Sequence, residues 1–119
     1  MGHYVDGFVV PVPNGKLDAY LDMAREAGGL WREHGALEFR ECVADDVKVG
    51  EVTSFPRSVL LESDETVVFS WIVFESREDR DRVNAAVMKD PRFEEMTKEE
   101  MPFDGQRMIF GGFEVAVEA

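Results

Sequence analysis

The sequence predicts an α+β fold of the ferredoxin-like type, β-α-β-β-α-β, in which two helices cover one face of a four-stranded antiparallel sheet. Two observations support this prediction. Four segments are rich in β-forming residues. A segment with helical spacing of apolar residues follows the first of them, and a segment with a helix cap and an acidic first turn follows the third. The chain has 119 residues and no internal repeat, low-complexity segment or linker, so residues 1–119 are expected to form one domain.

The first strand and the first helix have the plainest patterns. Residues Tyr4–Pro11 are β-rich and end at a proline. Asn14 is expected to cap the helix that follows, and Gly35 to supply the left-handed residue at its end. The apolar residues of this helix recur every three or four positions and so share one face; they are Leu17, Tyr20, Leu21, Ala24, Gly28 and Trp31.

Two further strands flank a polar insert. Residues Ala36–Ala44 alternate between apolar and polar side chains and predict the second strand, and Thr66–Phe74 is the clearest strand of the sequence. Residues 45–65 lie between them and follow no consistent pattern, because acidic residues, Gly50 and Pro56 interrupt them.

The last third of the chain predicts a second helix and a fourth strand. Ser76 is expected to cap a helix that extends to about Lys89, and Asp90-Pro91 to end it and begin a short one. Residues Gln106–Val117 predict the final strand. Gly111-Gly112 lies inside that strand rather than between a strand and a helix, so it indicates a bulge or a close approach and not a phosphate-binding loop.

The third strand is apolar on both faces. One face carries Val67, Phe69, Trp71 and Val73, and the other carries Val68, Ile72 and Phe74. Helices on one side of the sheet cover only one of these faces, and leaving Phe69 and Trp71 in water would forfeit roughly 1.5–3 kcal/mol each. We therefore expect a homodimer in which the sheets of two chains face each other around a partly apolar interior.

Charge excludes some partners. Lysine and arginine number 13 against 25 aspartates and glutamates, which gives a net charge of −12. Such a surface repels phosphates, so neither nucleic acid nor an anionic membrane is an expected partner. The N-terminal residues resemble no signal segment and the single Cys42 has no partner for an internal disulfide, so a cytoplasmic protein is expected.

Several segments taken together resemble a known family. They are "YVDGFVV", "HGALEFRECVADDV", "TVVFSWI", "MKDPR" and "MPFDGQRMIFGGFE". In this order they are similar to the bacterial family of unknown function typified by YbaA, over nearly the whole chain. The resemblance implies a dimeric α/β-barrel fold, which small cofactor-free monooxygenases, muconolactone isomerase-like proteins and heme-dependent proteins share. It supports the homodimer and implies no established reaction or catalytic motif; no cofactor is expected.

Four residues are candidates for ligand binding: Asp6, Arg40, Trp71 and Arg107. Asp6 lies inside a strand, where aspartate is disfavoured, so it requires a partner, for which Arg40 and Arg107 are the candidates. Such a pair is either an anchor for a small ligand in the barrel interior or a buried ion pair of structural use. Trp71, with Phe69, either lines a pocket or packs in the core or the dimer contact.

Residues with other reactive side chains have simpler interpretations. His34 is a candidate general base or a residue that the dipole favours at the end of the first helix. Cys42 is interpreted as a small core residue, and Asp45-Asp46 as a solvated acidic pair. Because the two histidines are far apart in the sequence, no metal site is expected.

Two functions follow from these patterns. The first is a protein that binds or converts a small hydrophobic or aromatic molecule in the barrel interior, for example as a cofactor-independent oxygenase or isomerase. The alternative is a non-catalytic dimeric module for protein interaction or stress response, with a filled interior and an acidic working surface. The sequence does not decide whether the protein is an enzyme.

Overall fold

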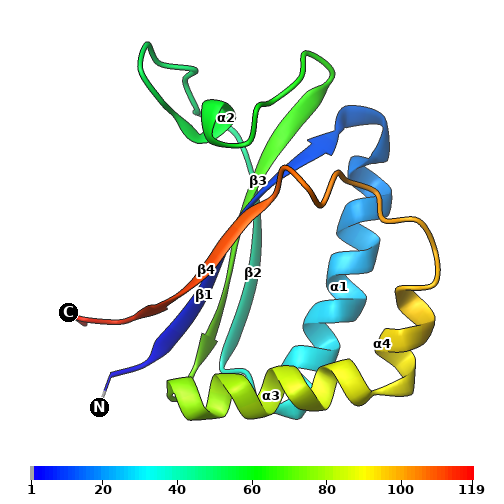
Figure 1. Cartoon of the computed structure of the whole chain (residues 1–119), viewed down its shortest axis with the longest axis vertical. Helices are drawn as coiled ribbons and strands as arrows, with labels where there is room; N and C mark the ends of the chain where they lie inside the picture. Colours follow the sequence, from blue (N-terminus) through cyan, green and yellow to red (C-terminus); the bar gives the residue numbers. More distant parts are fainter. Residues whose placement is uncertain (1) are drawn as a thin grey trace.

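The computed structural model describes residues 2–119 and has the predicted ferredoxin-like fold (Figure 1). Its elements are β1 (Tyr4–Pro13), η1 (Asn14–Lys16), α1 (Leu17–His34), β2 (Glu38–Val43), α2 (Phe55–Ser58), β3 (Glu65–Phe74), α3 (Arg77–Lys89), α4 (Pro91–Met96) and β4 (Ile109–Glu114). The four strands form one sheet in the order β2-β3-β1-β4, and every pairing is antiparallel. Among residues 2–119, no helix has the length and apolar character needed to cross a membrane.

One face of the sheet is covered by helices. Asp6 pairs with Ile72 and Phe8 pairs with Ser70, so alternate residues of β1 and β3 share this face. In Figure 1, α1, α3 and α4 all lie on the same side of the sheet. The side chains buried between the two layers include Val10, Val12, Val68, Phe74, Val83 and Val87.

The other face of the sheet has little cover within the chain. Near one end, Val9 and Val67 pack with Val59 from the segment that contains α2. Figure 1 shows that segment at the end of the sheet remote from α3. Phe69 and Phe113 stay 41% and 64% exposed on this face, which we call the open face.

The ends of the helices follow local chemistry with one exception. Gly35 ends α1 at φ 126°, a left-handed backbone that favours glycine. The Ser76 side chain accepts a hydrogen bond from the Asp79 backbone N–H and caps α3, as expected. The cap predicted at Asn14 is wrong: its backbone N–H donates to the Asp64 carbonyl at 2.8 Å, and a 3-10 turn precedes α1 instead.

The last strand is shorter than predicted, because the chain before Ile109 is held in a turn. Arg107 pairs with Asp104 at 2.9 Å and with Glu65 of β3 at 2.6 Å. From Ile109 onward β4 pairs with β1 in unbroken register through both glycines, so the predicted bulge is absent. The groups that approach Gly112 closely are the side chains of Tyr4 and Arg80, not the backbone of another element as expected.

Candidate functional site

A cavity of about 400 Å³ lies between the helices and the sheet. Its walls come from all four strands, from α1, α3 and α4, and from the segment between α4 and β4. Every methionine within residues 2–119 lines it: Met23, Met88, Met96, Met101 and Met108. Aromatic rings complete the walls: Phe8, Trp31, Phe39, Phe93, Phe103 and Phe110. Thioethers are flexible and polarisable, so this wall suits apolar molecules of varied shape.

A polar cluster is enclosed in the wall of this cavity. Asp6 of β1 is buried, and its Oδ1 lies 3.5 Å from the Nε of Arg80 on α3. Asn84, one turn further along α3, donates from Nδ2 to the other Asp6 oxygen at 3.4 Å. The orientation of this amide is fixed, because the Trp31 indole N–H donates to the Asn84 Oδ1 at 2.9 Å.

The Arg80 guanidinium is held against the edge of the sheet. It donates from Nη2 to the Tyr4 hydroxyl at 3.0 Å and lies over the Tyr4 ring, 4.9 Å from its centroid. Gly112 leaves room for this arrangement, because a Cβ at that position would lie 2.7 Å from the Arg80 Nη2. The Arg80 Nε is buried and has no hydrogen-bond partner.

The environment of Asp6 raises the pKa of its carboxyl above the ordinary value for aspartate. Burial raises the pKa of the Asp6 carboxyl, although Arg80 and the Asn84 amide oppose part of this rise. A carboxylate beside an arginine in an apolar cavity can accept a hydrogen bond or a proton from a bound molecule.

A second pair of polar groups lies in the same cavity. The Tyr20 hydroxyl of α1 donates to the Glu41 carboxylate of β2 at 2.7 Å, and the Phe103 ring packs edge-on against Tyr20. Burial raises the pKa of Glu41, and the hydrogen bond from Tyr20 lowers it by less. The cavity therefore encloses two carboxyl groups, Asp6 and Glu41, on different strands of the sheet.

The structure separates the four predicted site residues. Asp6 faces the cavity, but the expected pairing with Arg40 or Arg107 is wrong, because Arg80 and Asn84 are its partners. Arg40 lies on the open face and is paired with Glu38 at 2.8 Å. Trp71 lies on the same open face. Its indole packs against Phe69 and donates a hydrogen bond to the Glu38 carboxylate at 3.3 Å, and the residue also contributes to the cavity wall.

Arg107 lies outside the cavity and has a structural environment. It joins Asp104 and Glu65 and donates to the backbone carbonyls of Val59 and Leu60. Met101 and Phe103 line the cavity just before it in the chain. The Arg107 contacts therefore fasten one wall of the cavity to the sheet, and a ligand-binding role for Arg107 stays a prediction.

Sequence reasoning missed Arg80, Asn84 and Glu41. The first two lie on the same face of α3 as the buried Val83 and Val87, at positions i and i+4, and that spacing was a usable signal in an otherwise charged helix. Glu41 lies two residues after the partly buried Phe39 on β2 and therefore on the same face of the sheet, which was a second signal that it points inward.

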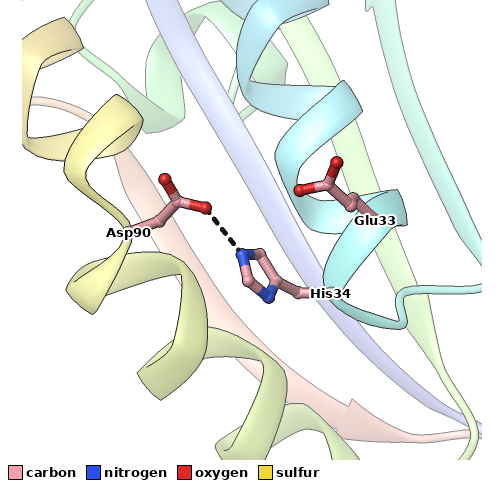
Figure 2. A group of neighbouring side chains, drawn as sticks. All are labelled: Glu33, His34 and Asp90. Carbon is pink, nitrogen blue, oxygen red and sulfur yellow. Dashed lines mark hydrogen bonds and ion pairs between the residues drawn. The ribbon is translucent and has the colours of Figure 1, made fainter.

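A cluster of acidic and imidazole groups lies outside the cavity, at the junction of α1, α3 and α4 (Figure 2). The His34 Nε2 lies 2.8 Å from the Asp90 Oδ2, and Glu33 lies beside them. Arg92 forms hydrogen bonds with both Asp90 and Glu33. The hydrogen bonds that Asp90 accepts from Arg92 and His34 lower the pKa of its carboxyl. The guanidinium already supplies positive charge, so the cluster ties the helices together and is not a strong candidate for a metal site.

The sequence matches a known family and a known protein over most of its length. Residues 3–105 match the model of a family described as a protein of unknown function (DUF1428). The uncharacterized protein YbaA of Escherichia coli K12 is 54% identical over 115 residues, which covers 97% of each chain.

Two solved structures are similar in fold at low identity. A dimeric ferredoxin-like protein from an uncultured marine organism has a TM-score of 0.63, 9% identity and full coverage of both chains. A putative antibiotic biosynthesis monooxygenase from Nitrosomonas europaea has a TM-score of 0.60 and 13% identity, over 98% of this chain and 93% of that one.

The raised pKa of Glu41 leads to a test by pH. The folded state keeps the Glu41 proton to higher pH than the unfolded chain does, so the free energy of unfolding falls as pH rises between the two pKa values. Glu41→Gln keeps an acceptor for the Tyr20 hydroxyl and removes this titration. Urea unfolding from about pH 4 to pH 7 should show the variant gaining stability relative to the wild type as pH rises.

Asp90→Asn is a control in which the stability should change with pH in the opposite direction. The pKa of Asp90 is lowered in the folded state, so this carboxylate contributes stability that is present above its unfolded pKa and is lost in acid. The variant should lose stability relative to the wild type as pH rises through the acid range. A Glu41→Gln curve parallel to that of the wild type would show that Glu41 is not buried as described.

Proposed function

The chain belongs to the DUF1428 family of proteins of unknown function, and we propose that it is a cytoplasmic homodimer that binds a small hydrophobic or aromatic molecule in the cavity between its helices and its sheet. The observation that carries this proposal is an apolar cavity with a buried charged cluster in its wall. Binding sites for small molecules have this composition, mostly apolar with a few fixed polar groups.

The dimensions of the cavity support a ligand of modest size. A volume of about 400 Å³ lies within the range of roughly 300–1,000 Å³ that is usual for ligand sites. The cavity is open to solvent on one side and mostly apolar, so an apolar molecule bound there would remove apolar surface from water. The predicted ligand site was the interior between the facing sheets of the dimer, whereas this cavity lies on the helical side of the sheet. It supports the binding proposal at a different place and leaves the filled interior of the alternative function a prediction.

Conversion of the bound molecule is a further part of the proposal. Asp6 and Arg80 at the cavity wall are suited to accept a proton and to stabilise the negative charge that remains. The likeness to a putative monooxygenase is an analogy of fold and names no substrate for this chain.

Blocking the cavity tests the binding proposal. Ala27 of α1 lines the cavity, and Ala27→Phe places a ring in it. A thermal-shift screen with small aromatic compounds should give hits with the wild type and lose them with this variant. Ala85→Phe adds the same ring at an exposed position of α3 and should keep the hits. No stabilisation of the wild type by any compound class would count against the proposal.

The open face supports the homodimer. Val5, Phe69 and Trp71 lie on it beside exposed aromatic rings of β4 and the α2 segment. α1, α3 and α4 pack on the opposite side of the sheet, and the α2 segment covers only one end of this face, so a second copy of the chain is an economical cover for the rest of it (Figure 1). The centroid of the Phe69 ring lies 5.5 Å from that of Trp71 and 5.6 Å from that of Phe55. The three rings form a continuous aromatic surface.

Light scattering at micromolar concentration tests the homodimer. The wild type should have twice the 13.5 kDa mass of one chain. Phe69→Asp should give a folded monomer, because a buried unpaired charge opposes a sheet-to-sheet contact. Ala85→Asp, on the helical side, should remain dimeric. A wild-type mass of 13.5 kDa would contradict the dimer and leave the binding proposal standing.

A further inference from the structure

We infer that the charged cluster in the cavity recognises a hydroxyl group of the phenol or enol type on the bound molecule. The inference rests on the proposed binding function and names the chemical class of its ligand. It is based on two hydrogen-bonding groups: a buried donor of Arg80 that has no hydrogen-bond partner in the protein, and the Asp6 carboxylate, which has only long contacts.

The first of these groups is a donor. The Arg80 Nε is buried, lies 3.5 Å from the Asp6 Oδ1 and has no hydrogen-bond partner. The rest of the guanidinium is engaged, since Nη2 donates to the Tyr4 hydroxyl and Nη1 lies 3.5 Å from an Asp81 oxygen. Buried donors without a partner are rare in proteins. An acceptor atom on the ligand would satisfy this one.

The second group is an acceptor. The Asp6 carboxylate has the long contact with Arg80 and a 3.4 Å hydrogen bond from the Asn84 amide. Two carboxylate oxygens offer about four acceptor positions, so Asp6 keeps capacity for a closer donor. Because Trp31 fixes the Asn84 amide, the amide cannot turn to present its oxygen to a ligand donor instead.

A hydroxyl group fits both requirements at once. Its O–H donates to Asp6, and its lone pairs accept from the Arg80 Nε. An ether only accepts, an ammonium only donates and would lie against Arg80, and a carboxylate would be repelled by Asp6. The aromatic and methionine walls select a hydroxyl attached to a flat apolar body.

The same contact allows a balanced proton transfer. The ligand O–H bond breaks, its proton moves to an Asp6 oxygen, and the electron pair stays on the ligand oxygen beside Arg80. The net charge of the cluster and ligand together is unchanged, because the negative charge passes from Asp6 to the ligand. Burial, which raises the pKa of Asp6, favours the protonated carboxyl that results.

Three probes of one shape test this inference: 1-naphthol, 1-methoxynaphthalene and 1-naphthoate, each titrated calorimetrically into the folded protein at neutral pH. The wild type should bind 1-naphthol at least about tenfold more tightly than the ether or the carboxylate, because only the hydroxyl makes both contacts. Equal affinity for 1-naphthol and its ether, or a preference for 1-naphthoate, would overturn the inference.

Asp6→Asn removes the carboxylate with little change of shape. 1-Naphthoate should become the preferred probe, since the charge that repelled it is gone while Arg80 remains, whereas the amide oxygen of the variant still accepts from the 1-naphthol hydroxyl. Asp81→Asn removes the neighbouring, more exposed charge on α3 and should leave the ranking as in the wild type. An unchanged ranking in Asp6→Asn would overturn the inference.

The outcomes separate this inference from the proposal on which it rests. If the three probes bind equally, the cavity binds apolar molecules and the hydroxyl inference alone is wrong. If none of the probes binds, and aromatic compounds of other sizes also fail, the proposed function is wrong as well. Should Asp6→Asn fail to fold, as judged by circular dichroism, the ranking of the probes by the wild type decides the inference.

Discussion

The sheet has two apolar faces, and within one chain α1, α3 and α4 cover one of them while the other has cover only at one end. β3 contributes large side chains to both sides, and β1 does so in register with it. On the helical side the layers do not close fully, and the remaining space is the cavity. On the other side Phe69 and Phe113 face outward. We propose that a small molecule fills the space on the helical side and that a second copy of the chain covers the other side.

Enclosing Asp6 and Arg80 between the layers has an energetic consequence. Charges taken out of water are stabilised only when their partners and hydrogen bonds are well placed, and here the contacts of Asp6 are long and the Arg80 Nε has none. By contrast, the ion pair of Arg107 with Glu65 is short and multiply bonded, and it fastens the cavity wall. The well-satisfied pair is structural, whereas the poorly satisfied one lies where a ligand would complete it.

The fold could be predicted from the sequence, because periodicity and capping are local properties. The Ser76 cap, the Gly35 helix end and the two-sided third strand all depend on neighbouring residues. The site could not be predicted in the same way. Asp6 and Arg40 lie on strands two positions apart in the sheet and on opposite faces, while the partner of Asp6 comes from a helix 74 positions later in the chain. Only the spacing of Arg80 and Asn84 with Val83 and Val87 indicated that these polar groups point inward.

The central claim is that a small aromatic hydroxyl compound enters the cavity and meets Asp6 and Arg80. The most direct measurement is NMR of protein labelled with ¹³C at the methionine and valine methyl groups, in the presence of 1-naphthol. Magnetisation should pass from the naphthol ring protons to Met23, Met88 and Met108, which line the cavity. Transfer only to Val5 and Val73 on the open face would place the compound outside the cavity and contradict the claim.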